Sequence, residues 1–205
     1  MSFTSYADLQ TTIAGYLARS DLTTQIPDFI RLAETRLRRD LRIRQMLKSV
    51  TTATVAADST IELPSDFLEV RDLIIDGSPP QSLNYSSPSA FTRNARTWQS
   101  GKPLDYTVLA NDFQLAPVPD SNYTAKMLYF AAPAFLSDTN TSNAFLANTP
   151  DALLYGALLE AEPYLMNDAR INTWGTMFDR AMASITRSDE QGQYSGVPLV
   201  IKTTL

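Results

Sequence analysis

The sequence predicts an α+β protein: a four-helix bundle from N- and C-terminal helix pairs, with an inserted antiparallel β-rich subdomain and an extended C-terminal tail. Near both ends of the chain, apolar residues recur every three or four positions. From about residue 47 to 132, β-branched and aromatic residues are punctuated by turn residues instead. Helices and strands do not alternate there, which argues against a parallel sheet. We expect the bundle at 1–46 and 149–190, the insertion at 47–148 and the tail at 191–205.

The first expected helix runs from about Tyr6 to Ala18. Ser5 can cap it, with Asp8 in the reciprocal position of a capping box. Its apolar residues follow helical spacing, so one face is expected to be buried.

The second expected helix begins near Pro27, since proline suits a first helical turn, and continues to about Met46. Two apolar stripes run along it, which indicates packing on two sides, either within a bundle or between subunits. One stripe comprises Ile26, Ile30, Ala33, Leu37 and Leu41, and the other comprises Phe29, Leu32, Ile43 and Leu47.

The central block reads as several short strands. Asp76-Gly77 and Asn111-Asp112 are typical of tight turns between strands, and a short helix is expected near Pro88. The strand segments are LKSVTTATV, EVRDLII, LDYTVLA, FQLAP and TAKMLYFAA. The aromatic residues of this block favour sheet core over a stacking surface for single strands or sugars; they are Trp98, Tyr106, Tyr123, Tyr129 and Phe130.

Residues 133–149 are expected to form a polar loop with two apolar anchors, and loops of this length are commonly functional. The anchors are Phe135 with Leu136 and Phe145 with Leu146. The third helix is expected to start at Thr149-Pro150-Asp151, and Pro163 should end or kink it. A fourth helix should reach about Arg187.

The composition excludes much catalytic chemistry. The chain has no histidine and no cysteine, so Ser-His-Asp and Cys-His catalysis, histidine-ligated metals and disulfides are impossible. No glycine-rich phosphate loop, secretory signal or membrane span is evident. The acidic pairs are better read as solvated surface than as a hydrolase dyad. We therefore expect no catalytic residues, no metal, no cofactor and no membrane partner.

The segment ETRLRRDLRIR, residues 34–44, contains five arginines in a chain of net charge −5. On a helix, Arg31, Arg38 and Arg42 would form one stripe. Residues 27–48 carry a net charge of +4, and the remainder carries −9. Three interpretations stay open: a solvated face with pairs such as Glu34 with Arg38, docking onto an acidic protein surface, or nucleic-acid binding. The third is weakened by the small footprint and by the acidity of the remainder.

The C-terminal segment VPLVIKTTL is apolar and β-prone, without helical spacing. Such a segment can fold back on its own strands or pair with the sheet edge of another chain. The side chains expected to bind a neighbouring chain are Val197, Pro198, Leu199, Val200, Ile201 and Leu205.

Several stretches resemble the head-to-tail adaptor (connector) proteins of tailed, mainly short-tailed, bacteriophages. They are SYADLQTTIAGYLARSDLTTQIPDFIRLAETRLRRDLR at 5–42, LPSDFLEVRDL at 63–73, PLDYTVLANDFQLAP at 103–117 and TPDALLYGALLEAEPYLMNDARINTWGTMFDRAMASI at 149–185. The features of the last stretch are the proline-capped helix, the Leu-Leu-Tyr-Gly-Ala-Leu run and Trp174. The resemblance covers almost the whole chain.

The resemblance implies a structural protein of the virion, at the capsid–tail junction and made in the host cytoplasm. Such adaptors form a ring, commonly dodecameric, that binds the portal protein above and tail nozzle or tail fibre proteins below while double-stranded DNA passes through. By this resemblance, the arginine stripe would contact a neighbouring subunit or the portal, and residues 197–205 would bind the portal or a neighbour. The 133–149 anchors would face the tail. The alternative is a nucleic-acid-binding accessory protein that uses the arginine-rich second helix.

Overall fold

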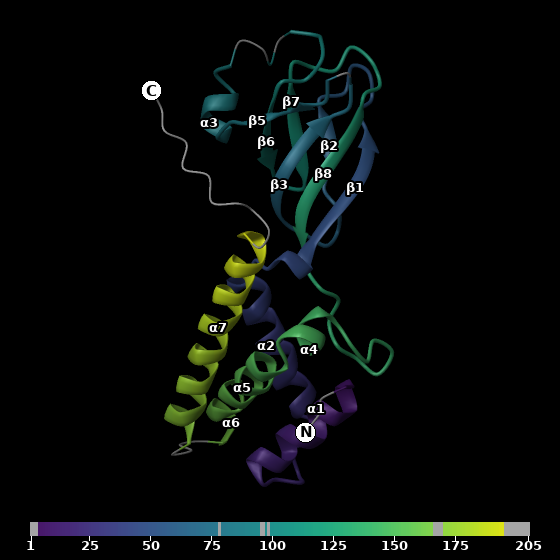
Figure 1. Cartoon of the computed structure of the whole chain (residues 1–205). Helices are drawn as coiled ribbons and strands as arrows, with labels where there is room; N and C mark the ends of the chain where they lie inside the picture. Colours follow the sequence, from purple (N-terminus) through teal and green to yellow (C-terminus); the bar gives the residue numbers. More distant parts are fainter. Residues whose placement is uncertain (1–3, 78, 95–96, 98, 166–169, 195–205) are drawn as a thin grey trace, which may run out of the picture. The chain divides into compact units, whose positions relative to one another are not determined.

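The computed structural model describes residues 4–77, 79–94, 97, 99–165 and 170–194, and the chain divides into two compact units. The helical unit comprises Met1–Gln45 and Pro133–Leu205, and the β unit comprises Met46–Ala132 (Figure 1). The fold is mixed α+β with antiparallel sheets, which confirms that part of the predicted fold class. No helix among the described residues is long and apolar enough to cross a membrane.

Helix α1 (Tyr6–Leu17) begins with the predicted capping box, in which Ser5 and Asp8 accept from each other's backbone N–H. The helix ends at Ala18, which adopts the left-handed conformation with φ of 53°. The capping box satisfies two backbone donors that would otherwise have no partner in the first turn.

Helix α2 (Ile26–Asp40) is shorter than expected. The sequence predicted a helix to Met46, but Leu41 is extended, with φ of −101° and ψ of 137°. A short 3₁₀ turn follows at Arg44–Met46. Leu41 and Ile43 are nevertheless buried, so their apolar character reflects tertiary packing and not a continuing helix.

The C-terminal part of the chain contributes helices α4 (Ala144–Asn148), α5 (Pro150–Glu160), α6 (Glu162–Leu165) and α7 (Ile171–Tyr194). Pro163 lies in α6, just after α5 has ended, as its missing N–H predicts. Helix α5 packs against α1, α2 and α7. A Cβ added at Gly156 would lie 3.2 Å from the Ala33 Cβ and 3.3 Å from Phe178 Cε2, so glycine permits this close approach.

Residues 133–148 belong to the helical unit, although the sequence placed them in the insertion. The reason is packing: Leu136, Phe145 and Leu146 are buried, and Tyr6 donates its backbone N–H to Thr141 O at 2.8 Å. Part of the expected loop also folds as α4, which Asn143 caps.

In the β unit, the described strands form two four-stranded sheets. The first has the order β1-β8-β3-β4, with bounds Leu47–Ala53, Thr124–Ala131, Phe67–Ile75 and Gln81–Ser82. The second has the order β2-β7-β6-β5, with bounds Thr60–Glu62, Asp112–Ala116, Asp105–Leu109 and Asn84–Tyr85. The short helix α3 (Pro88–Phe91) lies where Pro88 predicted it.

The two sheets share one apolar core, with residues from both in contact. The strand pairs are antiparallel except β5 with β6, a two-residue parallel pair that the sequence did not predict. The aromatic side chains Tyr106 and Tyr129 are buried in this core, and Tyr123 packs partly buried against it, which supports the sheet-core interpretation over a stacking surface. Phe130 is also buried, but it does not belong to this core. Trp98 lies outside the described residues, so the structure does not bear on it.

Candidate interaction surface

A buried carboxylate connects α2 to the segment that follows the β unit. Glu34 is 1% exposed, although it lies in a charged stretch of the sequence. Its two oxygens accept from the Leu136 N–H at 3.1 and 3.2 Å, and Oε1 also accepts from Asn143 Nδ2 at 2.6 Å. Residues 133–143, which we call the strap, are thus fixed to α2 by hydrogen bonds to a single side chain.

Asn143 connects the strap to the helix that follows it. Its Oδ1 accepts from the N–H groups of Phe145 and Leu146 at the start of α4, at 3.1 and 3.0 Å. Its Nδ2 donates both to Glu34 and to Ala134 O, the latter at 2.9 Å. A single amide therefore caps a helix and closes the strap, which explains how a polar segment remains ordered.

Burial raises the pKa of Glu34 above its ordinary value of 4.5. Hydrogen bonds from Leu136 and Asn143 and the positive charges of Arg38 and Arg31 oppose this shift without cancelling it. The carboxylate therefore carries a desolvation cost, which its donors partly offset.

Two of the predicted interface arginines hold the ring of Phe135 within the helical unit. The Cζ atoms of Arg31 and Arg38 lie 3.2 and 3.1 Å from the ring centroid. At such distances the two guanidinium groups must occupy opposite faces of the ring. Each gains a cation–π contact, and the strap gains a second attachment to α2. Arg38 also donates to Pro133 O, and burial lowers its pKa below the ordinary value.

Arg42 does not belong to this arrangement, because α2 has ended before it. Its Nη1 donates to the backbone oxygens of Arg38 and Leu41, at 2.9 and 2.7 Å. The prediction of one exposed stripe of Arg31, Arg38 and Arg42 was therefore wrong in its geometry. The expected pair of Glu34 with Arg38 does not lie on a solvated face, because Glu34 is buried, although the positive charge of Arg38 does act on its carboxylate.

The apolar anchors of the expected loop differ in position. Phe135 is half-buried between the arginines, whereas Leu136, Phe145 and Leu146 are 5%, 0% and 2% exposed. These three side chains stabilise the helical unit and cannot face a tail protein in this conformation. The expected binding tail, Val197 to Leu205, lies outside the described residues.

Other polar contacts of the helical unit were missed by sequence reasoning. Asp189 on α7 is 8% exposed and accepts from the backbone N–H of Arg44 at 2.9 Å. Arg36 lies 4.4 Å from the centroid of the Phe178 ring and 3.9 Å from Glu160. The partners in each contact are far apart in sequence, so no local pattern indicated them.

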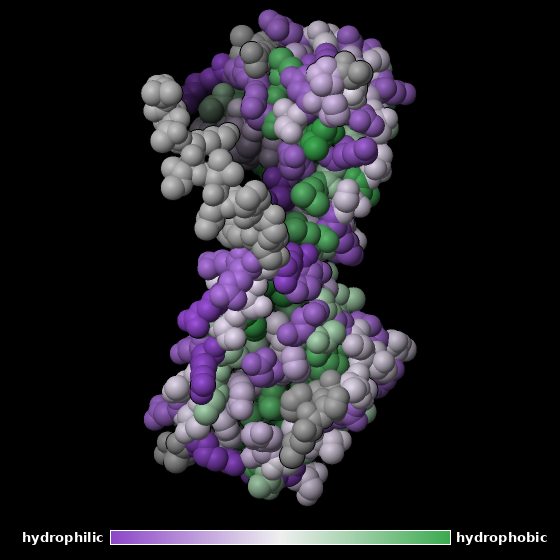
Figure 2. All heavy atoms as spheres, viewed as in Figure 1, coloured by the Kyte–Doolittle hydropathy of each residue, from purple (hydrophilic) through white to green (hydrophobic). Residues whose placement is uncertain are grey.

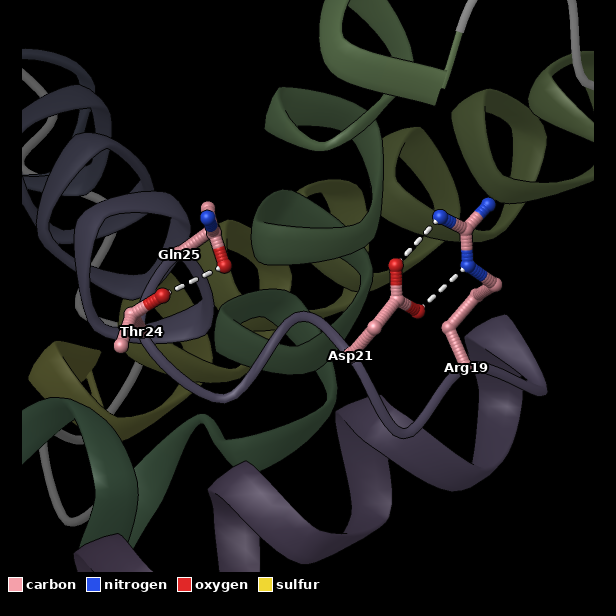
Figure 3. Close-up of polar contacts among 4 residues, drawn as sticks. All are labelled: Arg19, Asp21, Thr24 and Gln25. Carbon is pink, nitrogen blue, oxygen red and sulfur yellow. Dashed lines mark hydrogen bonds and ion pairs between the residues drawn. The ribbon is translucent and has the colours of Figure 1, made fainter.

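The turn between α1 and α2 carries an exposed ion pair. Arg19 donates through Nε and Nη2 to both oxygens of Asp21, at 2.7 and 2.6 Å (Figure 3). This lowers the pKa of Asp21 to about 2. In the same turn, Thr24 Oγ1 donates to Gln25 Oε1 at 2.8 Å (Figure 3). These contacts lie in solvent and shape the turn more than they stabilise the unit.

The surface shows hydrophobic residues interspersed with hydrophilic ones on the face seen in Figure 2. Among the described residues, the exposed large hydrophobics are Tyr16, Leu32, Val55, Tyr85, Tyr164 and Met177. Leu32 belonged to the predicted second stripe of α2 and is 49% exposed, so that stripe is only partly buried. No group of three metal-ligating side chains occurs within the described part of the chain.

Comparison with known proteins identifies the class. A family model matches residues 4–201, which makes this chain a phage adaptor protein, a virion component that interacts with other phage structural proteins. The family is described as the SU10 adaptor protein, and the chain belongs to it. A search of curated proteins found no match.

Proposed function

We propose that this protein forms a ring between the portal and the tail nozzle or fibres of a tailed phage, with DNA passing through the central channel. The observation that carries the proposal is the family match over residues 4–201, nearly the full length of the chain. A ring of about twelve copies follows from the resemblance described above. The role is structural and involves no catalysis.

The charge distribution supports passage of DNA without tight binding. Outside residues 27–48 the chain carries a net charge of −9, which disfavours contact with phosphates. Within that segment, Arg31 and Arg38 are engaged with Phe135. The arginine-rich helix is thus a weaker candidate for nucleic-acid binding than its sequence indicated.

We assign the arginines an assembly role that acts through the strap. Arg31 and Arg38 fix Phe135, and the strap then presents its exposed residues, among them Asp138 and Thr139, in one conformation. Replacing both arginines by glutamine should loosen the strap and weaken ring formation or portal docking. The matched control is Arg39→Gln, an exposed residue of the same helix.

Electron microscopy of the protein mixed with its cognate portal tests the function. We expect a ring on the portal, with its stoichiometry given by native mass spectrometry. Deleting residues 197–205 should abolish that complex while circular dichroism shows an unchanged fold. A protein that remains monomeric with the portal, or that binds duplex DNA with a steep salt dependence, would contradict the proposal.

A further inference from the structure

The β unit contains an open groove between the outer strands of its two sheets. The groove has a volume of about 860 Å³ and is lined by residues of β1, β2 and the segments beside them. Its floor includes Met127 and Ile61, which are 1% and 5% exposed, and its rim includes Val55, which is 58% exposed. An exposed valine beside core residues marks a place where the apolar interior reaches the surface.

Acidic residues line the groove without basic ones. Asp58, Glu62 and Asp112 contribute three carboxylates, and the other lining residues are uncharged. The chemistry therefore favours an occupant that presents apolar side chains to the groove and carries no acidic side chain, which these carboxylates would repel.

Strand β1 lies at an edge of its sheet and forms one wall of the groove. Among the described strands, β1 (seven residues) pairs only with β8, and β2 pairs only with β7. Alternate N–H and C=O groups of an edge strand have no partner within the sheet, so they can pair with an added strand. Of the two edge strands that line the groove, β1 is the longer.

The chain itself contains a segment with the required chemistry. Residues 195–205 follow α7, contain no acidic residue and carry one lysine, Lys202. In an extended conformation, alternation places Val197, Leu199 and Ile201 on one face. At ~3.3 Å per residue, the eleven residues can span roughly 36 Å.

We infer that residues 197–205 of one copy add as a strand to the free edge of β1 in a second copy, with Val197, Leu199 and Ile201 over the groove. The inference rests on the proposed ring, because it supplies the contact between neighbouring copies. The acceptor, which is the free edge of β1, lies entirely within the β unit.

The absence of cysteine from the chain makes disulfide trapping a clean test. One preparation carries Thr51→Cys on β1, and a second, differently tagged preparation carries a single cysteine at 199, 200, 201 or 202. The two are mixed and oxidised, and the products are separated without reductant. Neighbouring strands bring Cα atoms about 4.5–5.5 Å apart, within disulfide reach. The matched control is Ser82→Cys, on β4 at the opposite edge of the same sheet.

We expect about tenfold more mixed dimer with T51C than with S82C, since docking raises the effective concentration of the thiols. Yields should alternate along 199–202 with a period of two. Adding Ile201→Asp to a chain with its cysteine at another tail position should remove the product, because the aspartate would face the apolar floor and the carboxylates of the groove.

Native mass spectrometry of the wild-type protein with its portal separates the two proposals. A ring without T51C cross-links above the control overturns the inference and leaves the proposed function standing. Cross-links without a ring support the inference and count against the proposed function. A chain that carries both cysteines and closes on itself as a monomer shows that the tail folds back, and this also overturns the inference.

Discussion

The helical unit uses a buried carboxylate, Glu34, to join segments distant in sequence, whereas in the β unit the buried carboxylate Asp105 lies outside the apolar cluster that the two sheets share. Glu34, 1% exposed, joins two segments about a hundred residues apart through the Leu136 and Asn143 hydrogen bonds. In the β unit, the Thr107 side chain is 0% exposed, and its hydroxyl has no hydrogen-bond partner among the described residues. The helical unit thus depends on directed polar contacts to place the strap, while the β unit depends on packing.

The largest expected effect is at Glu34. Glu34→Ala removes the acceptor of two buried donors, so it should lower the free energy of unfolding of the helical unit by about 3 kcal/mol. Urea denaturation followed by far-UV circular dichroism measures this. Glu190→Ala, an exposed acid on α7, serves as the control and should have little effect. Equal effects of the two variants would show that the buried contacts of Glu34 do not stabilise the helical unit more than an exposed acid does.

The raised pKa of Glu34 predicts that the free energy of unfolding of the helical unit depends on pH. Because the folded-state pKa of Glu34 is raised above 4.5, the folded state binds more protons than the unfolded state between these two values. Its contribution to stability is therefore greatest below pH 4.5 and declines as pH rises through the folded-state pKa. Glu34→Gln should flatten this decline. Denaturation midpoints of wild type and E34Q across this pH range should converge in acid, and parallel curves would refute the prediction.

An intermediate effect is expected at Gly156. Gly156→Ala places a methyl group against Ala33 and Phe178, so it should cost about 2 kcal/mol through overpacking. Gly175→Ala, also in a helix (α7), is the matched control, because a Cβ added at Gly175 would have no neighbouring heavy atom within 4 Å. That variant should stabilise by up to about 1 kcal/mol through helix propensity. Stabilisation by both would show that α5 can move away from its neighbours.

A smaller effect of opposite sign is expected in the β unit. Thr107→Val replaces an unpartnered buried hydroxyl by a methyl group of similar size, and it should raise stability by about 1 kcal/mol. Thr54→Val should instead destabilise, since the Thr54 hydroxyl donates to Ser121 O and accepts from the Tyr123 N–H. Thermal unfolding of the two variants checks the contrast. A lower midpoint temperature than wild type for both variants would contradict it.

The smallest effect is expected at the exposed ion pair. Asp21→Asn should leave the denaturation midpoint unchanged at neutral pH, because solvent screens the Arg19 contact. With a folded-state pKa of about 2, any contribution of Asp21 is present above pH 4 and lost as pH falls towards 2. A clear shift in midpoint at pH 7 would show that this turn matters more than its exposure indicates.

Local signals in the sequence predicted local structure well. The Ser5 and Asp8 capping box, the α3 start at Pro88 and the β6–β7 hairpin all follow from residues close together in the chain. The end of α2 was not predicted, because no glycine or proline marks it and apolar spacing continues through Leu41 and Ile43. Those side chains are buried by packing that the chain achieves in an extended conformation.

Contacts distant in sequence could not be predicted from residue patterns. Glu34 reads as a surface acid because its partners Leu136 and Asn143 lie more than a hundred positions away. For the same reason, Arg31 and Arg38 indicated an outward-facing stripe, although Phe135 lies between them. Charge composition reveals how many charges exist and not which of them the fold turns inward.

The pairing of β1 with β8 has a consequence for how such chains change over time. Leu47 lies opposite Phe130, so the chain enters and leaves the β unit through adjacent strands. A cassette with neighbouring ends can be excised and the gap closed by a short linker, without rethreading the helices. Recombination at two points, one on each side of residues 46–132, would thus exchange this part of the gene for another and leave the helical unit intact.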